Sequence, residues 1–69
     1  MFKKYKKKKA IKEITNDVAL HGKDTGTATY YFFNCDVSWK EFVTAMEAGR
    51  KIFEINELLQ KKQELKDEN

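Results

Sequence analysis

Residues 27–35 carry the sequence TATYYFFNC, and this stretch decides the fold prediction. Aromatic and β-branched residues fit a pleated, half-buried surface, and no charged residue interrupts the run. The stretch therefore predicts a β-strand over about residues 27–36. A strand must hydrogen-bond to another backbone segment, so a second strand is expected elsewhere in the chain.

The second strand is predicted over about residues 10–20. There the apolar residues Ile14, Val18 and Leu20 alternate with polar or small residues, as expected for a half-buried strand. Residues 21–26, HGKDTG, form a turn-rich cluster with the length of a hairpin loop. The two segments together predict an antiparallel β-hairpin.

A helical alternative exists for the first of these segments. Ile11, Ile14 and Val18 also follow the i, i+3, i+7 spacing of one helix face. This pattern leaves open an αβα arrangement in which residues 3–20 are helical and cross a single strand.

A long C-terminal helix is predicted over about residues 39–66. Ser38 can cap its first turn, and Glu41 completes a capping box. An unbroken helix of this length would be about 42 Å long, whereas a compact globule of this size has a radius of gyration of about 11 Å. The helix must therefore either bend at Gly49 or project from the domain. The predicted fold class is α+β, with the elements in the order ββα.

The apolar residues of this helix fall on two opposite faces, and one hairpin can cover only one of them. The second face has the 3-4 spacing of a helix-pair seam, with small residues at one end. It predicts a homodimer interface formed by Ala45, Ala48, Ile52, Ile55 and Leu59. The alternative is that the helix breaks at Gly49 and its second half folds back on the same sheet.

The net charge of +3 divides unevenly along the chain. Residues 1–12 hold seven lysines and no acid, whereas residues 13–69 hold seven basic and eleven acidic residues, a net charge of −4. We interpret residues 1–9 as a basic flexible tail and residues 10–69 as one small domain. The tail predicts salt-sensitive, sequence-independent contact with DNA or RNA phosphates. The predicted phosphate-binding residues are Lys3, Lys4, Lys6, Lys7, Lys8, Lys9 and Lys12. A solvated tail that aids solubility is the equal alternative.

Tyr30 and Phe32 would point outward from the predicted strand, and we interpret them as a partner-binding pair. They could be covered by the second copy of a dimer, by another protein, or by nucleic-acid bases stacked on their rings. The leading function is thus a non-enzymatic regulatory protein that binds nucleic acid. The alternative is a protein-binding inhibitor or adaptor of the kind that phages and mobile elements encode.

No catalytic, metal-binding or cofactor-binding motif is found in the sequence. A nucleophile needs an adjacent base, but His21 and Cys35 are the only histidine and cysteine. The sequence therefore predicts no enzyme activity, no metal and no cofactor. The apolar run that a signal peptide needs is broken by charged residues, and no stretch has the length of a membrane span. The expected location is the cytoplasm of a bacterium or of a phage-infected host cell.

Overall fold

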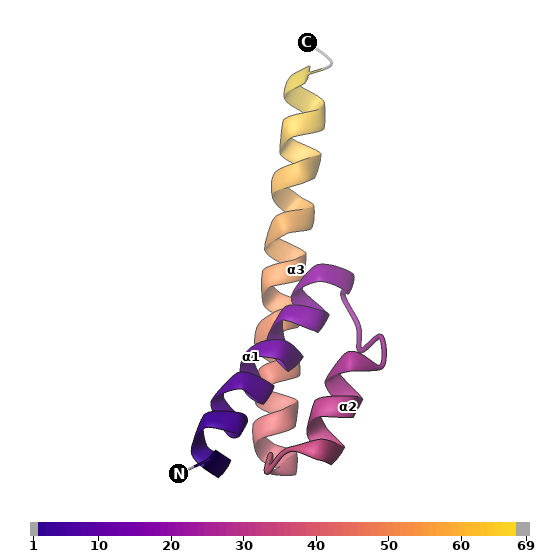
Figure 1. The fold of residues 1–69 in the computed structure, drawn as a ribbon. Helices are drawn as coiled ribbons and strands as arrows, with labels where there is room; N and C mark the ends of the chain where they lie inside the picture. The colour runs from indigo at the N-terminus through magenta and orange to yellow at the C-terminus, as the bar shows by residue number, and fades with distance from the viewer. Residues whose placement is uncertain (1, 68–69) are drawn as a thin grey trace.

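The chain folds into three helices, shown in Figure 1, a computed structural model that describes the backbone of residues 2–67 and the side chains of residues 6–65. The helices are α1 (Phe2–His21), α2 (Thr27–Asn34) and α3 (Trp39–Asp67). Residues 2–67 contain no β-strand, so the predicted α+β class and its β-hairpin are wrong and the fold is all-α. The αβα alternative is also wrong, because residues 27–34 are helical, although its N-terminal helix matches α1.

Helix α1 contains the residues that were predicted as the first strand. Its buried face consists of Ala10, Ile14 and Val18, each at most 2% exposed and spaced four residues apart, as one helix face requires. The helix ends at Gly22, whose φ of 76° is a left-handed conformation, and the Gly22 N–H donates to the Val18 carbonyl at 2.7 Å. The expected tail at residues 2–9 is part of this same helix.

Helix α2 contains the residues that were predicted as the second strand. Its preceding residue, Gly26, supplies no side-chain cap. Two aspartates provide the missing acceptors instead. Asp24 accepts from the N–H and hydroxyl of Thr29, and Asp17 of α1 accepts from the N–H of Ala28. These hydrogen bonds satisfy N–H groups that a helix start leaves unpaired.

Helix α3 begins as the sequence predicts. The Glu41 N–H donates to Ser38 Oγ at 3.1 Å, and the Ser38 N–H donates to Glu41 Oε1 at 2.9 Å, which confirms the capping box. The helix continues through Gly49 without a break, so it projects rather than bends. Gly49 instead lies against α1, where a Cβ atom would come within 2.5 Å of the Thr15 carbonyl oxygen.

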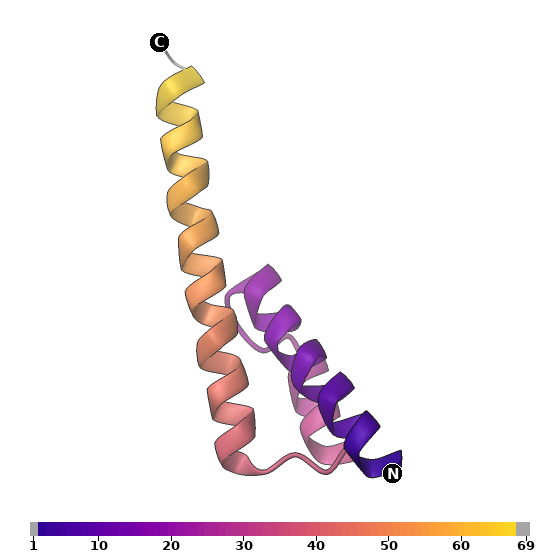
Figure 2. The same cartoon turned by 90° about the vertical axis from the view of Figure 1, so that its left-hand side faces the viewer.

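The core lies where α1, α2 and the first half of α3 meet, with α1 packed along α3 and α2 packed along α1 (Figures 1 and 2). Its buried cluster consists of Ala10, Ile14, Ala28, Val37, Phe42 and Ala45. The second half of α3 extends beyond the other two helices (Figure 2). As a result the described chain measures 54 × 19 × 16 Å, and its radius of gyration is 14.8 Å rather than the roughly 11 Å of a compact chain of this length.

Candidate nucleic-acid interface

Four of the predicted phosphate-binding lysines lie exposed on α1. They are Lys6, Lys8, Lys9 and Lys12. Because α1 is a helix, these side chains spread over more than one face of it, as 100° per residue requires. Lys8, Lys9 and Lys12 line a shallow depression together with Glu13, whose carboxylate offsets part of their charge. The side chains of Lys3 and Lys4 lie outside the described residues.

Lys7 differs from the other lysines because it is engaged within the fold. Its Nζ lies 3.3 Å from Glu41 Oε2, and both side chains are only about one-third exposed, at 37% and 35%. The pKa of Glu41 lies below its ordinary value because the Ser38 backbone N–H and the Lys7 ammonium stabilise the carboxylate. Lys7 thus joins α1 to the start of α3.

A second group of residues brings lysine and tyrosine together, which the sequence analysis did not predict. Lys6 and Lys9 of α1 line the same groove as Tyr30 and Tyr31 of α2. Asn34 and Cys35 complete the groove, which has a volume of about 290 Å³. We call it the lysine–tyrosine groove. Tyr30 is 60% exposed, and its ring meets that of Tyr31 edge-on, with 5.3 Å between ring centroids.

Phe32 does not share a surface with Tyr30. A helix rotates by about 200° from residue i to residue i+2, whereas the predicted strand would have placed these two side chains on one face. The Phe32 ring is half-buried and packs against Phe42 and Trp39, with centroid distances of 4.6 and 5.9 Å. The structure therefore gives Phe32 a packing role between α2 and α3 and leaves Tyr30 as the exposed member of the pair.

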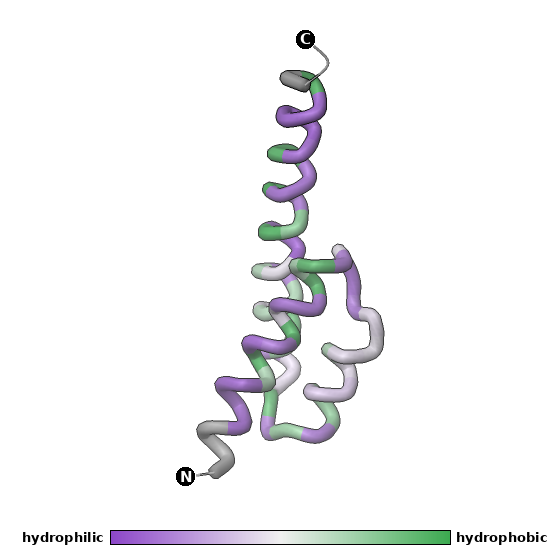
Figure 3. The backbone as a smooth tube through the Cα atoms, turned by 45° about the horizontal axis from the view of Figure 1, so that its top comes forward, coloured by the Kyte–Doolittle hydropathy of each residue, from purple (hydrophilic) through white to green (hydrophobic). Residues whose placement is uncertain are grey.

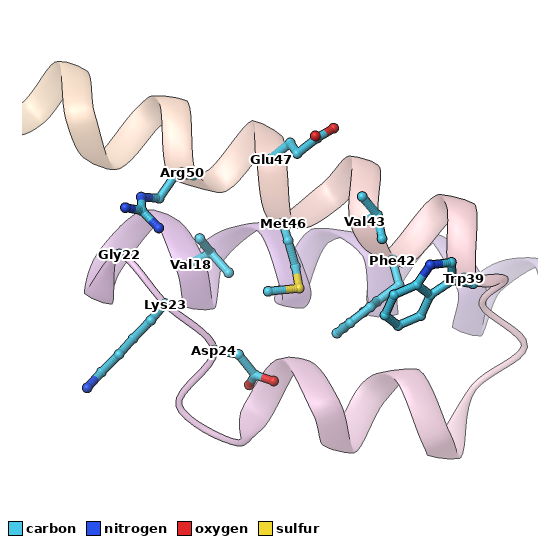
Figure 4. Close-up of a pocket in the computed structure, with 10 residues that line it drawn as sticks. All are labelled: Val18, Gly22, Lys23, Asp24, Trp39, Phe42, Val43, Met46, Glu47 and Arg50. Carbon is cyan, nitrogen blue, oxygen red and sulfur yellow. The ribbon is translucent and has the colours of Figure 1, made fainter.

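An apolar groove with a volume of about 460 Å³ opens between α2 and α3, with α1 behind it (Figure 4). Its apolar part is formed by Phe42, Val43 and Met46, and Lys23 and Arg50 lie at the end near Gly22. The full lining is Val18, Gly22, Lys23, Asp24, Trp39, Phe42, Val43, Met46, Glu47 and Arg50. No sequence pattern predicted it, because its lining comes from α1, the residues that follow α1, and α3, which only the folded chain brings together.

The five residues predicted as a dimer interface are not equivalent in the structure. Ala45 is 3% exposed and belongs to the core cluster against α1, so it cannot contribute to an external contact. The other four are exposed and lie along α3, where green, hydrophobic segments alternate with purple, hydrophilic ones in Figure 3. We call this set the aliphatic stripe: Ala48, Ile52, Ile55 and Leu59. Its three large members are 44%, 56% and 59% exposed.

The single histidine lies in the hydrogen-bond network around Asp17, which caps α2. His21 Nδ1 donates to the Asp17 carbonyl at 3.0 Å and lies 3.1 Å from its carboxylate oxygen Oδ1. The Thr25 hydroxyl donates to the same Oδ1 at 2.6 Å. Since the hydroxyl bonds to the carboxylate and not to the imidazole, the histidine does not activate it as a nucleophile. Cys35 lies at the opposite end of α2.

The described residues contain no group of three or more histidine, cysteine, aspartate or glutamate side chains placed to hold a metal ion. Within the same part of the chain, no helix combines the length and the apolar character that crossing a membrane requires. Comparisons with models of protein families, with curated proteins and with solved structures found no match.

Proposed function

We propose that this chain is a non-enzymatic nucleic-acid-binding protein that contacts phosphates through the exposed lysines of α1. The observation that carries the proposal is the exposure of Lys6, Lys8, Lys9 and Lys12 on one short helical segment. Ammonium groups that neutralise phosphates release condensed counterions, and this release drives binding. The acidic residues of the remaining chain limit the contact to this end of the molecule.

The contact is expected to be largely independent of sequence. The side chain that most often reads a base pair is arginine, through its two-pronged contact with guanine. Arg50 is the only arginine, and it lies on α3 beside Glu54, with Nε 3.8 Å from Oε2. The lysines of α1 act as point charges toward phosphates and do not distinguish one base pair from another as arginine does. We place the activity in the cytoplasm of a bacterium or of a phage-infected cell.

The proposal is tested by two variants with the same net charge. In the first, Lys6, Lys8, Lys9 and Lys12 are changed to glutamine. In the control, four exposed lysines elsewhere are changed to glutamine: Lys40, Lys51, Lys61 and Lys62. Fluorescence anisotropy with labelled oligonucleotides over a series of salt concentrations measures affinity and salt slope.

The α1 variant should lose most of its affinity, and the slope of log K against log salt should fall by about 0.7–0.9 for each phosphate contact removed. The control should bind like the wild type. Equal losses in both variants would show that net charge alone governs binding, and unchanged binding by the α1 variant would overturn the proposal.

The aliphatic stripe supports a homodimeric form of this nucleic-acid-binding protein. Ile52, Ile55 and Leu59 of α3 are large aliphatic side chains that lie exposed to solvent. Their spacing of three and four residues matches the seam of a helix pair. The occupant that we propose for this stripe is a second copy of the chain, and the homodimer would present two basic α1 segments to one nucleic acid.

A further inference from the structure

We infer that the lysine–tyrosine groove binds single-stranded nucleic acid, with Lys6 and Lys9 contacting phosphates and the Tyr30 ring stacking on a base. This inference rests on the proposed function and specifies the form of nucleic acid bound. DNA and RNA single strands share the phosphate and the base face that the groove would contact.

The first argument is the pairing of charge with an exposed ring. Lys6 and Lys9 come from α1 and Tyr30 from α2, and all three line one groove. Proteins that bind single strands combine a basic groove along the backbone with aromatic rings on which bases stack. In the lysine–tyrosine groove both elements lie side by side.

The second argument is the accessibility and support of the ring. Tyr30 is 60% exposed, so its ring is open to solvent, while Tyr31 meets it edge-on and limits its rotation. The Asn34 side chain donates to the Tyr30 carbonyl at 2.7 Å and holds the last turn of α2. A ring fixed in this way loses little conformational entropy when a base stacks on it.

The third argument concerns the duplex. Bases in a duplex are stacked on one another, and a tyrosine ring reaches a base face only where the base is unpaired and splayed out. A duplex would therefore engage only the lysines and leave Tyr30 without a role. A single strand can contact the lysines through its phosphates and stack an unpaired base on the Tyr30 ring at the same time.

Helix α2 offers a matched control. Phe33 is 76% exposed and lies on the same helix, but it does not line the lysine–tyrosine groove. Tyr30→Leu and Phe33→Leu each remove one exposed aromatic ring from α2. Tyr30→Phe retains the ring and removes only the hydroxyl. Circular dichroism of each variant checks that the helices are retained.

The probes are an oligothymidylate, an oligouridylate and a duplex of mixed sequence. The wild type should bind the single strands more tightly than the duplex. Tyr30→Leu should weaken single-strand binding on the order of tenfold while leaving the salt slope and the duplex affinity unchanged. Tyr30→Phe and Phe33→Leu should bind like the wild type. A difference between the two single strands would assign the natural ligand to DNA or to RNA.

Photocrosslinking provides a readout that needs no variant. Wild-type protein is irradiated with an oligonucleotide that contains 5-bromouracil, and the crosslinked residue is located by mass spectrometry. Crosslinking at Tyr30 supports the inference, whereas crosslinking confined to α3 overturns it.

The two levels of the proposal fail in different ways. If the α1 lysine variant binds normally, phosphate contact by α1 is wrong. If that variant loses binding but Tyr30→Leu does not, or if the wild type prefers duplex, only the single-strand inference is wrong.

Discussion

The carboxylate of Asp17 on α1 accepts a hydrogen bond from the backbone N–H of Ala28 on α2, with 3.1 Å between Oδ2 and the nitrogen. The same oxygen accepts the Thr25 N–H at 3.0 Å, and Oδ1 accepts the Thr25 hydroxyl. Asp17 is 5% exposed. A buried carboxylate of one helix thus caps the start of the next, where it also interacts favourably with the helix dipole.

Asp17→Ala should destabilise the fold by about 1–3 kcal/mol, because the buried Ala28 N–H and the two Thr25 donors would lose their acceptor. Urea unfolding followed by circular dichroism measures the change. Asp36→Ala is the control, since Asp36 is exposed and should tolerate the change. Equal midpoints for Asp17→Ala and the wild type would show that the cap is dispensable.

Stability should fall in acid through Asp17 and Asp24. Burial raises the pKa of each carboxyl, but hydrogen bonds to Asp17 from Thr25 and Ala28 and to Asp24 from Thr29 and Gly26 outweigh it, and both pKa values lie below the ordinary 3.8. The unfolded chain therefore takes up protons first as pH falls. The stabilisation that the two ionised carboxylates provide is fully present above about pH 3.8, the ordinary pKa. It is lost as the pH drops through the lower pKa values of the folded protein.

Urea unfolding over a pH series measures this effect. A variant with both aspartates changed to asparagine should be less stable at neutral pH and should show a shallower loss in acid. A slope identical to that of the wild type would assign the acid sensitivity to other carboxyls, such as Glu41.

Gly49→Ala should destabilise the contact between α1 and α3. An added Cβ would lie 2.8 Å from Val18 Cβ and closer still to the Thr15 carbonyl oxygen, and both belong to helix α1, which must then move. The expected overpacking cost of about 1–3 kcal/mol outweighs the roughly 1 kcal/mol that alanine gains over glycine in a helix. The difference between Thr44→Ala and Thr44→Gly, at an exposed α3 position outside the aliphatic stripe, measures the helix-propensity effect alone. A stabilised Gly49→Ala protein would mean that the two helices are not this close.

Ser38→Ala removes the side-chain acceptor of the Glu41 N–H and should lower the free energy of unfolding by about 1 kcal/mol. Thermal unfolding measures the change. Ser38→Asp provides the control, because aspartate is an equally good cap and should retain the wild-type midpoint. A midpoint unaffected by alanine would contradict the capping role.

Ile55→Asp should convert the proposed homodimer to a monomer, because it places a charge in the aliphatic stripe. Asn56→Asp adds the same charge at the next exposed position, outside the stripe, and should leave the dimer intact. Sedimentation equilibrium of all three proteins decides between these outcomes. A wild type that remains monomeric at high micromolar concentration would overturn the dimer.

Helix α3 could be predicted because its signals are local. The capping box of Ser38 and Glu41 and the absence of proline act within one segment and need no other part of the chain. The role of Gly49 could not be predicted in the same way, because it depends on another helix. The backbone of α1 at Thr15 comes so close to α3 there that a Cβ atom would collide with it.

Helix α2 was mispredicted because its sequence favours a strand while its surroundings favour a helix. Preference for strands mainly measures how well side chains fit a half-buried surface, and tertiary contacts override it. The acceptor on Asp17 lies eleven residues before Ala28, and only the folded chain brings it to the start of α2. Ile14 and Val18 fitted a strand pattern together with Leu20 and a helix pattern together with Ile11, and the mistaken strand at residues 27–36 settled the choice wrongly.

The lysines of the candidate interface could be predicted from charge alone, but the groove could not. Lys6 and Tyr30 line one groove because α2 packs along α1, whereas the prediction had Lys6 in a flexible tail that precedes the hairpin. The sequence pointed to Tyr30 as an exposed ring and paired it with Phe32, which the helix turns inward against Phe42.

The second half of α3 has a consequence for amide exchange. Residues 54–65 are all exposed, so this segment buries little surface that could keep its backbone hydrogen bonds from opening. An unsupported helical segment of this length is marginal in water. Its amides should exchange with deuterium far faster than those around Ile14, and any partner that covers the aliphatic stripe should slow them. Exchange protection along α3 therefore reports occupancy of the stripe, residue by residue, without knowledge of what occupies it.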